Sequence, residues 1–194
     1  MRYILDTYIR AEDTKVVSEL GNMSLVELLL QGKTTTPADL VKDLPGDNEA
    51  KAETIDNNLQ HEIVKKMSSN SVYYGKLSEM LKKIIMQRKI EAMSYEEYLR
   101  QVVELAEAIL HPETSGSYPD EIKDSAARRA LYDYFEQKVE LTIDVDGAIR
   151  VSIQPEWKRN FQKQQRIRLA IYKKLLLHSY SEDKATEETN NVFD

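Results

Sequence analysis

The feature that most constrains this chain is a long central stretch without proline. Residues 49–110 contain no proline and a single glycine, Gly75. Because proline breaks helices and glycine weakens them, such a stretch favours long helices. Within it, Ile55, Leu59 and Ile63 recur every four residues, which is the spacing of one helical face. We therefore expect amphipathic helices that bury their apolar faces against one another.

Two further helices are predicted within the same stretch. Leu77, Leu81 and Ile84 mark the apolar face of the second. The third begins with a capping box, Ser94 followed by Glu97, in which each side chain bonds to the backbone of the other residue. Since the breaks between these helices are short, they predict antiparallel neighbours in one bundle.

The chain as a whole is predicted to be mainly α, a multi-helix bundle of amphipathic helices. A loop rich in proline and glycine, residues 111–119, provides the clearest internal boundary. The expected parts are a connecting segment with a short helix (1–48), a central helical bundle (49–110), a second helical part with a basic helix (111–178) and a flexible polar tail (179–194).

Residues 139–153 allow two interpretations. Apolar residues alternate on either side of Asp146-Gly147, which is typical of a small β-hairpin with a tight turn. The same residues also place Leu141, Val145 and Ile149 on one helical face. We predict a helix, with the hairpin as the alternative.

The charge distribution singles out one segment. The formal net charge is −6, yet residues 157–174 hold seven bases and no acid. Mixed signs usually stabilise a solvated helix, so a run of one sign suggests a contact. The candidate partner or DNA contacts are Trp157, Lys158, Arg159, Lys163, Arg166, Arg168, Lys173 and Lys174.

Three interpretations of these bases remain open. They can form a solvated face or pair with the acidic stretch 112–156, they can dock an acidic protein, or they can contact DNA phosphates. Trp157, at the head of the run, is either a core anchor or a hot spot for a partner, because tryptophan is enriched in both places.

The sequence contains no recognisable catalytic or cofactor motif. There is no cysteine, no glycine-rich phosphate loop and no pair of histidines at metal-binding spacing. In residues 119–123 the acids and the lysine are consecutive, so they cannot surround one Mg²⁺ as a nuclease motif requires. No apolar run is long enough to cross a membrane. We therefore expect no catalytic residue, no cofactor, no metal and no membrane partner, and a cytoplasmic location.

Several short stretches nevertheless resemble one family. They include Tyr73-Tyr-Gly-Lys-Leu-Ser-Glu-Met-Leu81, Tyr95-Glu-Glu-Tyr98, Arg129-Ala-Leu-Tyr-Asp133 and Trp157-Lys-Arg-Asn160, and the similarity also covers residues 5–10, 23–28, 53–58, 117–120 and 148–150. In order and spacing they resemble the C-terminal helical region of the R subunit of type I restriction enzymes, the motor and endonuclease subunit. In that family this region lies far downstream of the start, so we expect the chain to be a fragment.

The resemblance implies a role without catalysis. The parent protein would be an ATP-dependent type I site-specific deoxyribonuclease that uses ATP and Mg²⁺ in other domains. This part would pack on the motor domains of the same polypeptide and help attach them to the methyltransferase core subunits. The alternative is a helical module that binds DNA phosphates through residues 157–174.

Overall fold

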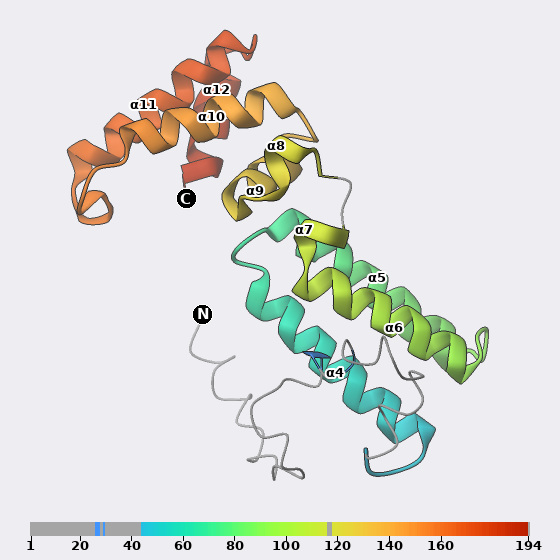
Figure 1. The fold of residues 1–194 in the computed structure, drawn as a ribbon. Helices are drawn as coiled ribbons and strands as arrows, with labels where there is room; N and C mark the ends of the chain where they lie inside the picture. The colour runs from blue at the N-terminus through green and yellow to red at the C-terminus, as the bar shows by residue number, and fades with distance from the viewer. Residues whose placement is uncertain (1–25, 28, 30–43, 116–117, 194) are drawn as a thin grey trace.

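The chain folds almost entirely into α-helices wherever its structure is described (Figure 1). The computed structural model describes residues 44–115 and 118–193, together with Val26, Glu27 and Leu29. The helices in chain order are α4 (Asn48–Lys66), α5 (Ser71–Lys89), α6 (Tyr95–Leu110), α7 (Pro112–Ser115), α8 (Asp120–Lys123), α9 (Ala126–Tyr134), α10 (Val139–Ser152), the 3₁₀ turn η2 (Trp157–Arg159), α11 (Phe161–Leu177) and α12 (Glu182–Phe193). These residues contain no strand, so the predicted mainly helical class is confirmed. Residues 1–25, 28 and 30–43 of the predicted connecting segment lie outside the described residues, so of its predicted short helix only Val26, Glu27 and Leu29 are placed, and these are helical.

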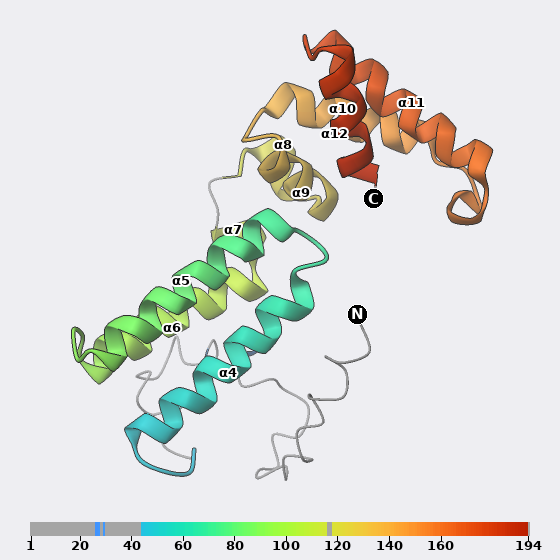
Figure 2. The same ribbon diagram turned by 180° about the vertical axis from the view of Figure 1, so that it is seen from behind.

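Helices α4, α5 and α6 pack side by side as the first bundle (Figures 1 and 2). Each begins at a polar side chain that accepts a hydrogen bond from the first helical turn. Asp47 accepts from Ala50 over 2.9 Å, and Asn70 caps α5 in the same manner. Ser94 accepts from the backbone of Glu97 at 3.2 Å, which confirms the predicted start of α6. These caps satisfy backbone donors that the helix itself leaves unpaired.

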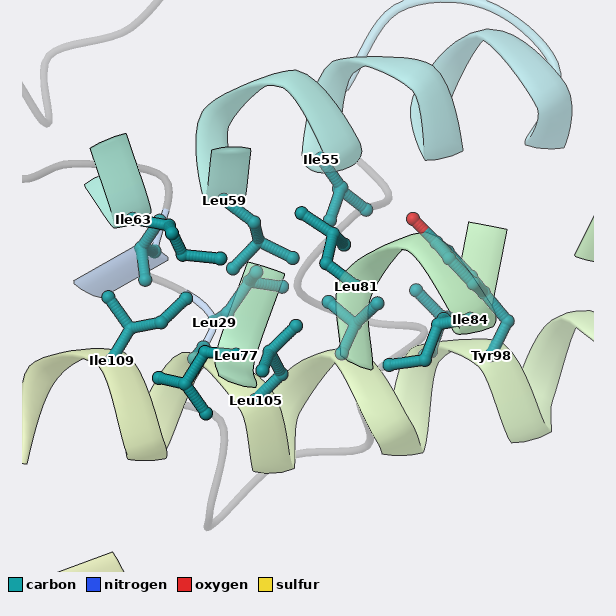
Figure 3. Packing of buried hydrophobic residues seen from close by; sticks show 14 of the residues in the cluster. Leu29, Ile55, Leu59, Ile63, Leu77, Leu81, Ile84, Tyr98, Leu105 and Ile109 are labelled. Atoms are coloured by element: carbon teal, nitrogen blue, oxygen red, sulfur yellow. The ribbon is translucent and has the colours of Figure 1, made fainter. Parts of the chain in front are cut away.

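The core of the first bundle is built from one apolar face of each helix (Figure 3). The predicted face of α4, formed by Ile55, Leu59 and Ile63, is fully buried. Val26 and Leu29 pack into the same cluster. The residues that complete it are Ala52 from α4, Tyr74, Leu77, Leu81 and Ile84 from α5, and Tyr98, Leu99, Val102, Leu105, Ala106 and Ile109 from α6. Each helix covers the apolar faces of the other two, so we expect the bundle to form as one unit.

A buried arginine links the three helices. Arg88 of α5 donates to Asp56 of α4 over 2.8 Å and also to the more exposed Glu49. Tyr98 of α6 donates its hydroxyl to the other Asp56 oxygen, again over 2.8 Å. Burial and the nearby Asp56 carboxylate raise the pKa of the Tyr98 hydroxyl above its ordinary value, so it stays a neutral donor. Since an unpaired buried charge is costly, this network favours a single register of the three helices.

The short helices α8 and α9 connect the first bundle to the second group of helices (Figure 2). Asp133 of α9 accepts hydrogen bonds from Asn70, at the start of α5, and from Tyr118, both over 2.6 Å. Burial, followed by the hydrogen bond to Asp133, raises the pKa of Tyr118. One carboxylate therefore joins the turn between α4 and α5 to α9.

Residues 139–152 form helix α10, so the alternative β-hairpin is wrong. Leu141 and Val145, one helical turn apart, are both buried in the second core. Gly147 lies inside the helix, where an added Cβ atom would meet only open space. The glycine that suggested a turn is thus accommodated without forming one.

The charged residues of α10 also favour the helix. Asp146 accepts from Arg150, four residues later, over 2.8 Å, and from Arg128 of α9 over 2.7 Å. In a helix Asp146 and Arg150 are neighbours one turn apart, close enough to bond, whereas in a strand the same spacing would hold them far apart. The helix therefore satisfies a nearly buried carboxylate that the turn of a hairpin would have left in solvent.

Helices α10, α11 and α12 form the second bundle (Figure 1). The sequence predicted a flexible tail from residue 179, but residues 182–193 form α12 and pack against α11. Ala185 is fully buried and Thr189, one turn later, is nearly so. Small residues at this spacing let α12 approach α11 closely, although they contribute little to an apolar pattern in the sequence. Tertiary packing thus orders a segment that reads as a polar tail.

Candidate functional site

The seven predicted basic contacts lie on η2 and α11, and the structure divides them into two groups. Lys158 and Arg159 belong to η2, and Lys163, Arg166, Arg168, Lys173 and Lys174 belong to α11. Asn160 separates the two elements, and its side chain accepts from the backbone of Lys163 at 3.1 Å. This cap starts α11 as a new helix and sets which way each base points.

Two of the bases bond to neighbouring parts of the fold. The Lys163 ammonium donates to the carbonyl of Pro155 over 2.7 Å. The Arg168 guanidinium donates to Asn190 of α12 over 2.6 Å and lies 4.0 Å from the centre of the Phe193 ring. These contacts hold α11 against the preceding loop and against α12, so both side chains are used within the fold.

A third base, Lys174, faces the carboxylate of Asp144 on α10 at 3.4 Å. His178, at the end of α11, bonds to the same carboxylate through Nε2 over 2.9 Å. The bond from His178 first, and that from Lys174 next, hold the pKa of Asp144 below its usual range. This cluster links α10 to the end of α11. Lys174 is the member of the basic run that pairs with the acidic stretch 112–156.

The remaining bases point outward. Lys158, Arg159, Arg166 and Lys173 are exposed. Lys158 lies 5.8 Å from the centre of the Trp157 ring. Across the described residues, Arg159, Arg166 and Lys173 have no carboxylate within ion-pair distance, 4.0 Å. These four side chains are therefore available to a partner, whereas Lys163, Arg168 and Lys174 are not.

Trp157 is held by the second bundle. Its side chain is partly buried against the second core, and its ring meets that of Phe193 edge to face at 5.8 Å. Edge-to-face aromatic pairs stabilise a fold by more than the burial of their apolar surface alone. The tryptophan thus fixes η2 in place and presents Lys158 and Arg159 beside it.

The exposed side of α11 also carries large apolar residues that the sequence did not single out. Phe161 is 72% exposed, Leu169 52%, Leu176 36% and Leu177 74%. The buried face is formed by Ile167, Ile171 and Leu175, and Leu177 is rotated away from it.

Bases and leucines share one stripe on α11, which we call the α11 seam. It consists of Gln162, Arg166, Leu169, Lys173 and Leu176, all of them exposed. They are separated by four, three, four and three residues, the spacing of helices that pack along their length. This signal was present in the sequence, but the buried stripe of the same helix has a similar period. Only the structure separates the two faces.

Two acids of the stretch 112–156 pair with bases of the same stretch. Asp146 is held by Arg128 and Arg150, and Asp120 pairs with Lys123 over 2.7 Å. This second pair lies in the segment 119–123 that superficially resembles a nuclease motif. A carboxylate bonded to the adjacent lysine stabilises the short helix α8.

No metal-binding cluster of three or more histidine or acidic side chains occurs within residues 44–115 and 118–193. Nor does any helix in that part of the chain combine the length and apolar character needed to span a membrane. His111 is exposed beside Glu113, at 3.4 Å, and His178 belongs to the Asp144 cluster. The outward face of α11 is accordingly the candidate site.

Similarity to known proteins was tested at the level of family, sequence and fold. Comparisons with protein-family models, with curated proteins and with solved structures gave no match. The resemblance to a restriction subunit therefore remains a prediction from the sequence.

Proposed function

We propose that this chain is the non-catalytic C-terminal domain of the R subunit of a type I restriction enzyme. It helps attach the ATP-driven, DNA-translocating and cleaving subunit to the methyltransferase core. The observation that supports a docking role is the α11 seam, where exposed leucines alternate with bases. Such a mixed surface suits another protein, since leucine gains by leaving water and each base can meet a carboxylate.

The proposed role of this domain is attachment without catalysis. In the proposed parent, nucleotide and Mg²⁺ bind in other domains, and this domain provides a rigid attachment. Two features support such rigidity, namely the buried Arg88 network in the first bundle and the Asp133 bonds that connect α9 to it. The motor domains of the same polypeptide would be a further contact, and the location would be cytoplasmic.

The proposal is tested by titrating the purified chain into the assembled methyltransferase core of a type I enzyme. Isothermal calorimetry at about 0.15 M salt, where exposed charges are screened beyond roughly 8 Å, would report binding. We expect saturable binding, with one chain bound at each place where an R subunit attaches to the core. Heat no larger than dilution, at concentrations well above micromolar, would contradict the assembly role.

A second candidate is a module that binds DNA phosphates, the alternative predicted from the sequence. The exposed Lys158, Arg159, Arg166 and Lys173 favour it, because they are not neutralised by carboxylates of the described chain. Neutralising phosphates releases counterions, so DNA affinity would fall steeply with salt. Fluorescence anisotropy with a labelled duplex at low salt tests this, and absence of binding there would eliminate it.

A further inference from the structure

We infer that the α11 seam binds an acidic amphipathic helix of a partner protein, laid lengthwise along residues 162–177. This inference rests on the assembly function proposed above and specifies the chemistry of the partner. The occupant follows from the spacing and charge of the seam residues and from the packing of α11 against α10 and α12.

The spacing indicates a helix as the occupant. Gln162, Leu169 and Leu176 repeat every seven residues, and Arg166 and Lys173 form the second series of the same repeat. Two helices that interlock along their length present this pattern to each other. A 17-residue helix is about 25 Å long, enough for roughly two heptads of contact. An extended peptide would not follow this period.

The side chains of the seam specify the character of the partner. Leu169 and Leu176 require apolar side chains opposite them, and Leu177 extends the apolar area at one edge. Arg166 and Lys173 require carboxylates at the intervening positions. A basic partner helix would meet like charges, and a purely apolar helix would leave both cations without water or a counter-charge.

The seam is already in its bound form. α11 is packed by α10 and α12 on its other sides, and Asn160 caps its first turn. Arg168 fixes it to α12 through Asn190. Ordering costs therefore fall on the partner alone, which strengthens binding for a given contact area.

A second copy of this chain is a poor occupant. If two α11 helices paired antiparallel about the middle of the seam, Arg166 of each copy would face Lys173 of the other. Like charges at facing positions on packed helices oppose association. The same leucines disfavour duplex DNA, because phosphate contacts leave apolar side chains unused.

The test uses the whole chain and a labelled helical peptide about three heptads long, with leucine at one core position and glutamate at the flanking positions. Two matched peptides replace either every glutamate by lysine or every leucine by serine. Fluorescence anisotropy at about 0.15 M salt reports affinity. We expect the acidic leucine peptide to bind and both matched peptides to bind at least about tenfold more weakly, a difference of roughly 1.4 kcal/mol.

Variants of the chain locate the contact. Arg166→Glu combined with Lys173→Glu, and separately Leu169→Asp, should each weaken peptide binding by about tenfold or more. Lys76→Glu is the control, since it reverses one exposed charge on α5, outside the second bundle. It should leave affinity within about twofold. Circular dichroism of each variant confirms that the total helix content is unchanged.

Three outcomes would overturn the inference: failure of the acidic peptide to bind, equal binding of the lysine peptide, or insensitivity to the seam variants. Binding instead to vesicles of phosphatidylglycerol and phosphatidylcholine, or self-association in sedimentation equilibrium, would assign the seam to a membrane or to a second copy. Titration with the methyltransferase core separates the two proposals. If the core binds but ignores the seam variants, assembly stands and the seam inference fails. If the acidic peptide binds but the core does not, the assembly function fails.

Discussion

The two bundles of this molecule use their apolar residues differently. In the first, α4, α5 and α6 enclose a core to which each helix contributes a complete face. In the second, the described core is smaller and includes Phe135, Leu141, Ile167 and Leu175. There, Phe161, Leu169 and Leu177 remain mostly exposed on α11.

The basic partners of the buried carboxylates are also more deeply buried in the first bundle than in the second. Asp56 and Arg88 both lie within the first bundle, with side chains 9% and 7% exposed. Asp146 of the second bundle is 4% exposed, but its partners Arg128 and Arg150 are 33% and 57% exposed. The first bundle thus buries both partners of its central ion pair, whereas the second leaves the arginines of its buried carboxylate partly exposed.

Large apolar side chains are exposed in both bundles, among them Met80 and Met86 on α5. The docking surface is placed on α11 because its exposed leucines share one stripe with Arg166 and Lys173, which form no ion pair within the described residues.

Removing a buried carboxylate should show the largest difference between the bundles. Asp56→Ala leaves Arg88 buried without its buried counter-charge and with only the more exposed Glu49, so we expect a loss of about 3–5 kcal/mol in the free energy of unfolding. Asp146→Ala should cost less, about 1–3 kcal/mol, because its arginines can turn toward water. Urea unfolding followed by circular dichroism measures both. Equal losses would mean that the two charge clusters are equally buried in solution.

Removing a leucine should separate the core from the α11 seam. Leu81→Ala, at a fully buried position, is expected to cost about 2–5 kcal/mol through lost apolar burial and an unfilled cavity. Leu169→Ala, at a position 52% exposed, should change stability by no more than about 0.5–1 kcal/mol. Thermal unfolding of both variants gives the comparison. A large loss for Leu169→Ala would show that this leucine is buried in the free chain.

Two helical glycines test whether the bundles unfold together. An added Cβ atom at Gly75 of α5 or at Gly147 of α10 meets nothing within 4 Å. Replacing either glycine by alanine should therefore raise the free energy of unfolding by about 0.5–1 kcal/mol. If calorimetry shows one unfolding transition, both variants should raise its midpoint temperature. If it shows two transitions, each variant should raise the midpoint temperature of a different one.

A third glycine serves as the opposite control. Gly46 has a positive φ of 96°, and an added Cβ would lie 2.7 Å from the Cβ of Ala50. Gly46→Ala should therefore destabilise the start of α4, in contrast to the two helical sites. Stabilisation by Gly46→Ala would contradict the turn described before α4.

The smallest effect concerns pH and the end of α11. Because the pKa of Asp144 is lowered in the folded chain, its contribution is present above the ordinary aspartate pKa of about 3.9. It is lost as the pH falls below that value through the folded pKa. Asp144 is 44% exposed, so the contribution should be below about 1 kcal/mol.

Comparing the melting temperatures of the parent and Asp144→Asn between about pH 3 and pH 6 isolates this contribution, because other carboxylates titrate in both proteins. The difference should be constant above about pH 5 and shrink below about pH 4. A difference that grows on acidification would contradict the described cluster.

Local patterns were sufficient where one helix face and one cap acted alone. The four-residue spacing of Ile55, Leu59 and Ile63 and the Ser94 cap predicted parts of the first bundle that the structure confirms. At residues 139–153 local patterns allowed two structures, and the predicted helix is confirmed. Gly147 suggested a turn, but Arg128 on another helix holds Asp146 in a helical position.

The candidate site was predicted as a segment but not as a surface. Seven bases in 157–174 identified the region. Which of them are free depended on residues far away in sequence, such as Asn190 for Arg168 and Asp144 for Lys174. The leucines of the seam were missed because the buried and exposed stripes of α11 have nearly the same period.

By itself, the sequence determined that the chain is helical, where its first bundle lies and where its bases gather. These properties arise from interactions between residues at most one or two helical turns apart. The tertiary structure decided that residues 182–193 pack as a helix, that α10 takes the predicted helical form and not the alternative hairpin, and which face of α11 meets solvent. Those outcomes depend on which helices lie next to one another, because burial and charge pairing across helices outweigh local preference.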